Sequence, residues 1–359
     1  MSTIDRSAAV RSGEELPLEP LLNYLSAQLP DLTGPLLVEQ FPAGYSNLTY
    51  LLRFANCELV LRRPPIAAKI KTAHDMYREY RILIHLHQVY NKVPLPLLFC
   101  DDEAILGTPF YVMERVSGVI LRAQPPADIE LSPALMRTLS ETFIDNLAEI
   151  HTIDYDDAGL SDLGSPQGYV KRQVEGWTRR YFNARTGDVP AIEQLATWLQ
   201  ANQPVDSVKS ALIHNDYKYD NLVLLPDDLG RVVAVLDWEM ATIGDPLMDF
   251  GTSLGYWVEA TDPEEWQRYG FGLTALPGSL TRTELLEHYT RRTGREIDEP
   301  VFYFAYGLLK IAVIVQQIYF RYQKGLTRDS RFAQLGGLVK ACGELAQRAI
   351  ERRRIDALD

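Results

Sequence analysis

The stretch from His214 to Asn221 holds the residues of this chain that are best suited to chemistry. It presents a carboxylate at Asp216, an amine at Lys218 and a side-chain amide at Asn221, and apolar runs flank it on both sides. Burial of those flanks would fix the loop between them. Phosphoryl transfer needs such a set: a carboxylate that orients a hydroxyl and accepts its proton, a cation near the transferred group, and an oxygen ligand for Mg²⁺.

A second carboxylate, Asp237, follows the apolar run at residues 232–236. A carboxylate at the end of a rigid strand is well placed to hold a metal ion. The alternative is that Asp216 and Asp237 only shape turns and cap helices, which is the usual role of aspartate in loops. For a single aspartate we would prefer that interpretation. The pattern H-x-D-x-x-x-x-N, followed closely by L-D-W-E, favours the catalytic one instead.

The pattern from His214 to Asn221 resembles the catalytic loop of protein kinase-like enzymes. It is most similar to the aminoglycoside phosphotransferase family, which usually has H-G-D-x-x-x-x-N and then I/L-D-W/F/L. The longer string from Leu236 to Asp249 resembles one branch of that family, the phosphotransferase domains fused to some acyl-CoA dehydrogenases. By motif, the resemblance extends from about Phe41 to Phe250.

This resemblance implies a role for each polar residue of the two segments. Asp216 would be the catalytic base, and Lys218 would contact the transferring phosphate. Asn221 and Asp237 would bind Mg²⁺. His214 would support the loop rather than titrate.

One residue of the loop departs from the family pattern. Asn215 stands where the family normally has glycine. Because asparagine tolerates left-handed backbone better than most residues, we expect the loop conformation to be retained.

The part of the chain before Ser117 predicts two helices and several strands. The expected helices cover residues 18–29 and 72–87, and the expected strands cover residues 36–41, 48–54, 58–62, 95–100 and 109–115. After Gly118 the pattern becomes mainly helical. Helices are expected at residues 132–152, 168–182, 191–201, 281–292, 300–322 and 332–353, with short strands at 211–213, 222–225 and 232–236.

These elements and the resemblance predict an α+β, bilobal protein kinase-like fold. A small β-rich N-lobe (residues 1–116) would bind the nucleotide, and a larger helical C-lobe (residues 117–359) would carry the catalytic loop and the acceptor site. The resemblance implies that ATP and Mg²⁺ bind between the two lobes.

A nucleotide site requires particular residues in the first lobe, and the sequence can be searched for them. The turn at residues 44–47 resembles the family's short phosphate-covering loop and would bring Ser46 and Asn47 to the nucleotide, although a plain hairpin turn has the same appearance. Arg62 replaces the expected strand lysine; it is a permanent cation that can contact phosphate oxygens through its fork. Glu79 matches the helix acid. A lone glutamate is usually a solvated helix charge, but the order of strand cation, helix acid and catalytic loop favours the functional role.

The resemblance also places the adenine along residues 110–116. Met113 would lie at the back of the pocket. The Glu114 carbonyl and the Val116 amide would meet the edge of the adenine ring.

Two further features have structural interpretations that we prefer. His151 ends a long predicted helix in an L-x-x-I-H pattern, where the family commonly has a packing or capping histidine. The basic residues between Lys171 and Arg185 could meet an anionic acceptor, such as the phosphates of a coenzyme A thioester. However, Arg172, Glu175 and Arg179 have helical spacing, so a self-paired exposed face explains much of this charge.

Composition excludes several classes of protein. The formal net charge of −12 argues against general nucleic-acid binding. The three cysteines show no metal or disulfide spacing, and the polar N-terminus has no signal-peptide core, so a cytoplasmic location is expected. The apolar run at residues 301–322 contains Lys310 and two glutamines, which favours a buried helix over a membrane span.

The predicted function is therefore ATP- and Mg²⁺-dependent phosphoryl transfer to a small-molecule hydroxyl. The family branch implies a hydroxyacyl acceptor, such as a 4-hydroxyacyl-CoA. The wider family offers aminoglycosides, choline and other amino alcohols, which the acidic net charge mildly favours. Two other classes are a non-catalytic nucleotide-binding protein and an acid-base hydrolase that uses Asp216 and Asp237. The hydrolase would leave Arg62 and Glu79 unexplained.

Overall fold

A computed structural model describes residues 5–42, 47–65, 76–123, 129–204, 209–269, 273–327 and 330–359. The chain packs as two units that are interleaved along the sequence. The first unit contains Met1–Ile120, Leu222–Asp228 and Val232–Glu239, and the second contains Leu121–Asn221, Leu229–Arg231 and Met240–Asp359. The expected functional boundary after residue 116 stays a prediction; the packing units show that a later hairpin returns to the first unit.

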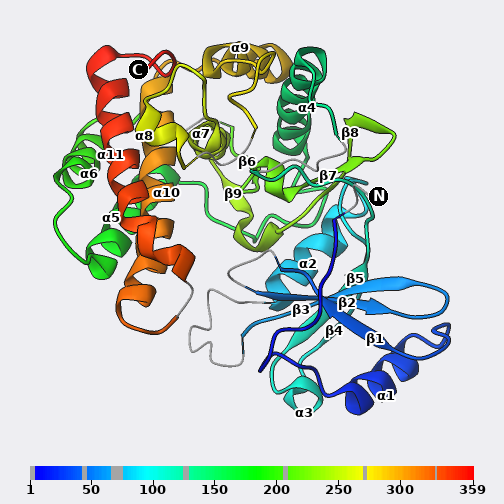
Figure 1. The fold of residues 1–359 in the computed structure, drawn as a ribbon. Helices are drawn as coiled ribbons and strands as arrows, with labels where there is room; N and C mark the ends of the chain where they lie inside the picture. The colour runs from blue at the N-terminus through cyan, green and yellow to red at the C-terminus, as the bar shows by residue number, and fades with distance from the viewer. Residues whose placement is uncertain are drawn as a thin grey trace. The chain divides into compact units, whose positions relative to one another are not determined.

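The first unit is built on a five-stranded antiparallel sheet, drawn in blue to cyan in Figure 1. Its strand order is β1-β2-β3-β5-β4. The strands are β1 (Leu37–Gln40), β2 (Leu48–Arg53), β3 (Glu58–Arg63), β4 (Pro96–Cys100) and β5 (Phe110–Glu114). The helices of this unit are α1 (Leu18–Gln28), α2 (Met76–Leu86) and α3 (Glu103–Leu106). Every strand predicted for this part of the chain is confirmed, to within one or two residues at each end.

Strand alternation decides which side chains of β3 meet which helix. Leu59 and Leu61 point into the apolar core that also contains Leu21 and Leu25 of α1. Successive side chains of a strand point to opposite faces of the sheet. Arg62 therefore faces the other side of the sheet, where α2 packs against β4 and β5.

The second unit is mostly helical. Its helices are α4 (Pro133–Thr152), α5 (Tyr169–Ala184), α6 (Pro190–Ala201), α7 (Pro246–Tyr256), α8 (Glu264–Gln267), α9 (Arg282–Thr293), α10 (Pro300–Gln323) and α11 (Leu335–Arg352). Two short strands, β6 (Ala211–Ile213) and β9 (Thr242–Gly244), pair antiparallel. Helix α10 packs against α5, α6, α7 and α11, and Figure 1 shows α5, α6 and α11 gathered beside it.

Helix α10 is the most apolar helix of the described chain and is long enough to cross a membrane. Most of its apolar stretch is buried against the other helices of the unit. That burial is typical of a core helix, as the sequence predicted.

Helix α7 is a helix that the sequence analysis did not predict. Its residues include Gly251, Thr252 and Ser253, which have low helix propensity. Tertiary contact compensates: a Cβ added at Gly251 would lie 2.3 Å from the Tyr303 carbonyl oxygen, so the glycine lets α7 and α10 approach closely. A readable start signal was present, since Asp245 caps the helix by accepting a hydrogen bond from the Leu247 amide.

The remaining differences are small. Helix α11 begins at Leu335 after a 3₁₀ turn at Ser330–Gln334, rather than at residue 332. The predicted strand at residues 232–236 is part of a longer strand, β8 (Asp228–Val235), which pairs with β7 (Leu222–Leu225). The short elements α3, α8 and β9 were not predicted. Residues 72–75 of the helix expected at 72–87 lie outside the described residues.

Candidate functional site

A buried arginine cluster lies on the α2 face of the sheet in the first unit. Arg62 of β3 donates a hydrogen bond to Glu79 of α2 at 2.5 Å and another to Asp237 Oδ1 at 3.0 Å. Glu239 lies 3.7 Å from the same guanidinium. Arg62 is 8% exposed and Glu79 is 1% exposed. The cation and helix acid that the sequence predicted are therefore brought together, although this contact does not by itself assign them a role.

Three carboxylates, those of Glu79, Asp237 and Glu239, lie around the Arg62 guanidinium. Burial opposes the charge of Arg62, but the Glu79 and Asp237 carboxylates raise the pKa of the guanidinium. Burial raises the pKa of Glu79, against the lowering effect of Arg62. Burial and the Glu79 carboxylate likewise raise the pKa of Tyr111. Because Asp237 and Glu239 are partly exposed, a metal ion or a polar ligand can reach their carboxylates.

The Arg62 side chain also has an unused donor. Its Nε atom is buried and finds no hydrogen-bond partner among the described residues. A buried donor without a partner costs free energy unless a ligand or a water molecule satisfies it. Asn47 is buried nearby and donates to Glu239 Oε2 at 2.7 Å. Ser46, predicted beside it, lies outside the described residues.

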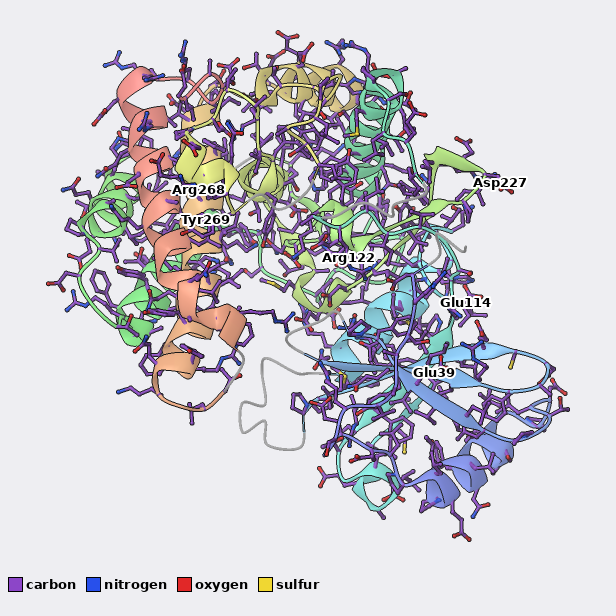
Figure 2. The ribbon with its side chains drawn as sticks, in the orientation of Figure 1. Glu39, Glu114, Arg122, Asp227, Arg268 and Tyr269 are labelled. Carbon is purple, nitrogen blue, oxygen red and sulfur yellow. The ribbon has the colours of Figure 1, made fainter. Side chains whose placement is uncertain are left out.

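The strand expected to meet adenine is β5, and Figure 2 labels Glu114 at its end. Met113 is buried, and the Glu114 carboxylate accepts a hydrogen bond from the Leu95 amide at 2.9 Å. The Val116 amide makes no hydrogen bond to any described residue. The Val116 side chain packs on an apolar cluster. The cluster also contains Ile120, Val223, Ala234, Val233 and Leu236. A free amide beside an apolar surface fits the edge of a planar base.

In the second unit, the Asp249 side chain of α7 holds the backbone of the loop that begins at His214. Its carboxylate accepts hydrogen bonds from the His214 amide at 2.8 Å and the Asn215 amide at 2.7 Å. His151 contacts the same carboxylate at 3.1 Å and Tyr289 at 2.7 Å. Burial opposes ionisation, but the hydrogen bond and charge of His151 hold the pKa of Asp249 below its ordinary value. His151 is thus a buried packing histidine, as expected.

Asp216 is surrounded by donors from its own loop and from α7. Lys218 Nζ lies 3.0 and 2.8 Å from its two carboxylate oxygens. The Tyr256 hydroxyl donates to Oδ1 at 3.1 Å, and Asn221 Nδ2 donates to Oδ2 at 3.2 Å. Burial opposes the Lys218 charge, yet the nearby Asp216 carboxylate raises the pKa of that amine. The predicted base and cation therefore form one hydrogen-bonded group.

Asn215 adopts the left-handed conformation that glycine normally supplies. Its φ is 68°, as expected for a residue that replaces glycine here. Its side-chain Nδ2 donates to the Met240 carbonyl at 3.1 Å, and its Oδ1 accepts from Tyr169 at 3.3 Å and from Lys310 at 3.2 Å. Asparagine thus keeps the conformation and adds side-chain contacts that glycine could not make.

The two predicted metal ligands sit on either side of one hairpin in the sequence. Asn221 directly precedes β7, Asp237 follows β8, and the ladder pairs Leu222 with Val235. Asn221 donates through Nδ2 to the Asp216 carbonyl at 2.8 Å, so its Oδ1 stays available as a ligand. Asp237 has φ of 66°, a strained backbone for aspartate that is common at functional sites. Among the described residues no cage of His, Cys, Asp and Glu side chains is present, but Mg²⁺ commonly takes only one or two protein ligands with phosphates and water.

The basic residues of α5, and Arg185 directly after it, make local contacts, but among the described residues Glu175 pairs with Lys171, at 4.0 Å, and not with Arg172 or Arg179 as expected. Arg172 bonds to the Gln167 and Ser165 carbonyls, Arg185 pairs with Glu193 at 2.9 Å, and Arg180 lies over the Trp177 ring.

Four residues of these sites were not predicted from the sequence. Asp249 stood inside the quoted motif but received no role, and Glu239 follows Trp238 in the L-D-W-E string. Tyr256 and Lys310 belong to helices remote in sequence from the loop. A charged residue within the apolar run of α10 was the one readable signal for Lys310.

Comparison with known proteins agrees with this geometry. Residues 37–285 match the profile of the phosphotransferase enzyme family. The chain is 34% identical to mouse acyl-CoA dehydrogenase family member 10 over 96% of its length, and 36% identical to human acyl-CoA dehydrogenase family member 11 over 86%. It spans only 32% and 39% of the lengths of those two relatives, which are both much longer proteins.

Solved structures show the same fold. The crystal structure of a putative aminoglycoside phosphotransferase from Ralstonia eutropha is 32% identical, with a TM-score of 0.76, covering 93% of this chain and 99% of that one. An APH(2'')-IIIa complex with GDP and kanamycin is 15% identical, with a TM-score of 0.60, covering 90% and 97%. The fold is therefore the bilobal α+β kinase-like fold that the sequence predicted. The chain belongs to the phosphotransferase enzyme family and is a small-molecule kinase.

Proposed function

We propose that the chain transfers the γ-phosphoryl group of ATP, with Mg²⁺, to a hydroxyl of a small acceptor. The observation that carries this proposal is the group around Asp216, in which a carboxylate, an amine and an amide converge on a loop held by Asp249. In this proposal Asp216 orients the acceptor hydroxyl and accepts its proton. Lys218 contacts the transferring phosphate. To do so, it replaces part of its hydrogen bonding to Asp216 with hydrogen bonds to the phosphate oxygens.

The nucleotide is proposed to use the first unit. The unused Nε of Arg62 suits a phosphate oxygen, and Glu79 holds the guanidinium in place. The Val116 amide and the Glu114 carbonyl suit the adenine edge, with Met113 behind the ring. Ser46 and Asn47 are proposed to cover the phosphates.

The metal is proposed to be bound by Asn221 and Asp237. The side-chain oxygen of Asn221 accepts no hydrogen bond from the described residues, and Asp237 presents a partly exposed carboxylate beside Arg62. When bound, Mg²⁺ neutralises charge on the phosphates and orients them. The chain's own residues supply the orientation of the acceptor and the site for its proton.

For the acceptor we propose a hydroxyacyl-CoA. The support is that two of the relatives are named as acyl-CoA dehydrogenase family members, and this chain covers only part of each. The likeness to a kanamycin complex, at 15% identity, concerns the fold alone. An amino-alcohol or aminoglycoside kinase is therefore the second candidate, and a non-catalytic nucleotide-binding protein is the third. The three free cysteines fit the cytoplasmic location that we propose.

The test measures ADP release with ATP, Mg²⁺ and three acceptor panels: hydroxyacyl-CoAs, amino alcohols and aminoglycosides. We expect release that depends on a hydroxyacyl-CoA. Asp216→Asn should lose at least about 10³-fold in kcat while ATP affinity by calorimetry stays within a few fold. Asp227→Asn is the matched control, because this aspartate is exposed at the tip of the β7–β8 hairpin (Figure 2). ATP binding without release on any acceptor would favour the non-catalytic candidate.

A further inference from the structure

Helix α10 carries one lysine in its buried, apolar middle. Lys310 is 1% exposed, and its neighbours in the helix, from Phe302 to Val313, are buried as well. Burying an ammonium group is costly unless strong acceptors surround it.

Lys310 is directed at the catalytic loop. Its Nζ donates to the Asn215 carbonyl oxygen at 2.5 Å and to the Asn215 side-chain Oδ1 at 3.2 Å. The Asn215 carbonyl and the Asp216 amide belong to the same peptide plane. That amide donates to His214 Nδ1 at 3.2 Å, so Lys310 holds one edge of the plane and His214 holds the other.

We propose that Lys310 is a positioning residue for phosphoryl transfer, which fixes the Asn215–Asp216 peptide and thereby aims the Asp216 carboxylate. The inference rests on the proposed function of Asp216. Lys310 acts through the main chain of Asn215 and needs no contact with either substrate. Its ammonium complements Asp249, which holds the preceding amides of the same loop.

A purely structural role explains Lys310 less well. Burial lowers the pKa of Lys310 to about 8, even though Asp249 on α7 and Asp216 on the loop act to raise it. Lys218 and Arg180 of α5 oppose its charge. The Tyr169 hydroxyl of α5 also donates a hydrogen bond to the Asn215 side chain. The buried face of α11 includes the Cys342 thiol, and burial raises the pKa of that thiol. A methionine would fill the same space without the cost of burying an ammonium group, but it would leave the two Asn215 oxygens without this donor.

The test compares Lys310→Met with Lys340→Met, an exposed lysine of α11 that pairs only with Glu344 among the described residues. We expect Lys310→Met to lower kcat by about 10- to 100-fold, because small misplacements of a catalytic group have effects of that size. The KM for ATP should change by less than about threefold, and the melting temperature should shift by only a few degrees, because the avoided burial cost offsets the lost hydrogen bonds. The control should match the wild type in all three. An unchanged kcat in Lys310→Met would overturn the inference.

The pH profile separates positioning from packing. In the wild type, kcat should decline as the pH rises through about 8, because Lys310 loses its proton and its charge. Lys310→Met should have low activity and lack this decline between pH 7 and 9. An identical alkaline limb in the variant would show that another group causes it and would count against Lys310.

Hydrogen exchange distinguishes failure of this inference from failure of the proposed function, because it needs no acceptor. In the ligand-free protein, peptides that contain residues 214–216 should exchange faster in Lys310→Met than in the wild type. The control variant should show no change. Faster exchange without acceptor turnover would keep the positioning role and reject the reaction, whereas unchanged exchange would reject the role. If Lys310→Met does not fold, the wild type alone is measured: protection at 214–216, corrected for intrinsic rates, should fall from pH 7 to 9.

Discussion

The two units each contain a buried cation near predicted catalytic residues, and the two cations are held in opposite ways. Arg62 is surrounded by the carboxylates of Glu79, Asp237 and Glu239, and they raise the pKa of its guanidinium. Lys310 is held by a carbonyl and an amide oxygen, and burial lowers the pKa of its amine. A cation held by charge stays charged at any accessible pH, whereas a cation held by dipoles can lose its proton.

This difference fits the roles that we propose for Arg62 and Lys310. A phosphate-binding cation must keep its charge as the ligand comes and goes, and arginine does so because its intrinsic pKa is very high. A cation that orients a peptide plane acts through the hydrogen bonds that its ammonium group donates, and these weaken when it loses its proton. The comparison therefore predicts different consequences when each cation, or its partner, is changed.

The largest effect is expected for Arg62→Met. Removal of the guanidinium leaves Glu79 buried without its partner, and loss of one member of a buried pair typically costs about 3–5 kcal/mol. Denaturant unfolding should show this loss, and ATP binding should disappear. Arg62→Lys is the matched control: it keeps the charge but not the fork, so it should be intermediate. A methionine variant as stable as the wild type would mean that the carboxylates do not depend on Arg62.

A smaller effect is expected for Asp249→Asn. The amide cannot accept from the His214 and Asn215 amides and from His151 as the carboxylate does, which should cost about 1–3 kcal/mol of unfolding free energy and lower kcat. Because the pKa of Asp249 is lowered on folding, its contribution is present above the unfolded pKa of about 4 and is lost as the pH falls through the folded pKa. The stability difference between wild type and variant should therefore shrink in acid. A difference that is independent of pH would contradict this assignment.

A third prediction concerns stability at alkaline pH. The folded pKa of Lys310 is about 8 and the unfolded value is about 10.4, so the unfolded chain binds more protons between them. Lys310 should therefore make the wild type more stable as the pH rises from about 8 to 10. Denaturant unfolding at pH 8, 9 and 10 should show that the unfolding free energy of the wild type rises relative to that of Lys310→Met. The stability of Arg62→Lys should follow the same pH trend as that of the wild type.

The smallest effect is expected for Asn215→Gly, which restores the usual family residue. Glycine relieves the left-handed backbone of Asn215 but loses the contacts with Met240 and Tyr169. These terms oppose one another, so the unfolding free energy should change by less than about 1 kcal/mol. Lys310 should still reach the backbone carbonyl, so kcat should fall by only a few fold. A loss as large as that of Lys310→Met would move the positioning role from the carbonyl to the Asn215 side chain.

Much of the architecture could be read from local pattern. Apolar runs separated by turn residues predicted the strands around Arg62, and long helical stretches predicted α4, α5, α9 and α10. Helix α7 escaped because Gly251 and its neighbours are poor helix formers, and the contact that stabilises the helix comes from α10, far along the chain.

The sequence by itself determined the chemistry that we propose for the loop from His214 to Asn221, because the residues assigned to it are close together in the chain and their types are specific. It also determined the order of strand cation, helix acid and loop. Only the tertiary structure decided how the loop is held. Asp249, Tyr256 and Lys310 come from two helices, and their hydrogen bonds to the loop depend on distances that no local pattern encodes. Local spacing can predict which groups react, but the direction in which they point is fixed by partners that only folding brings near.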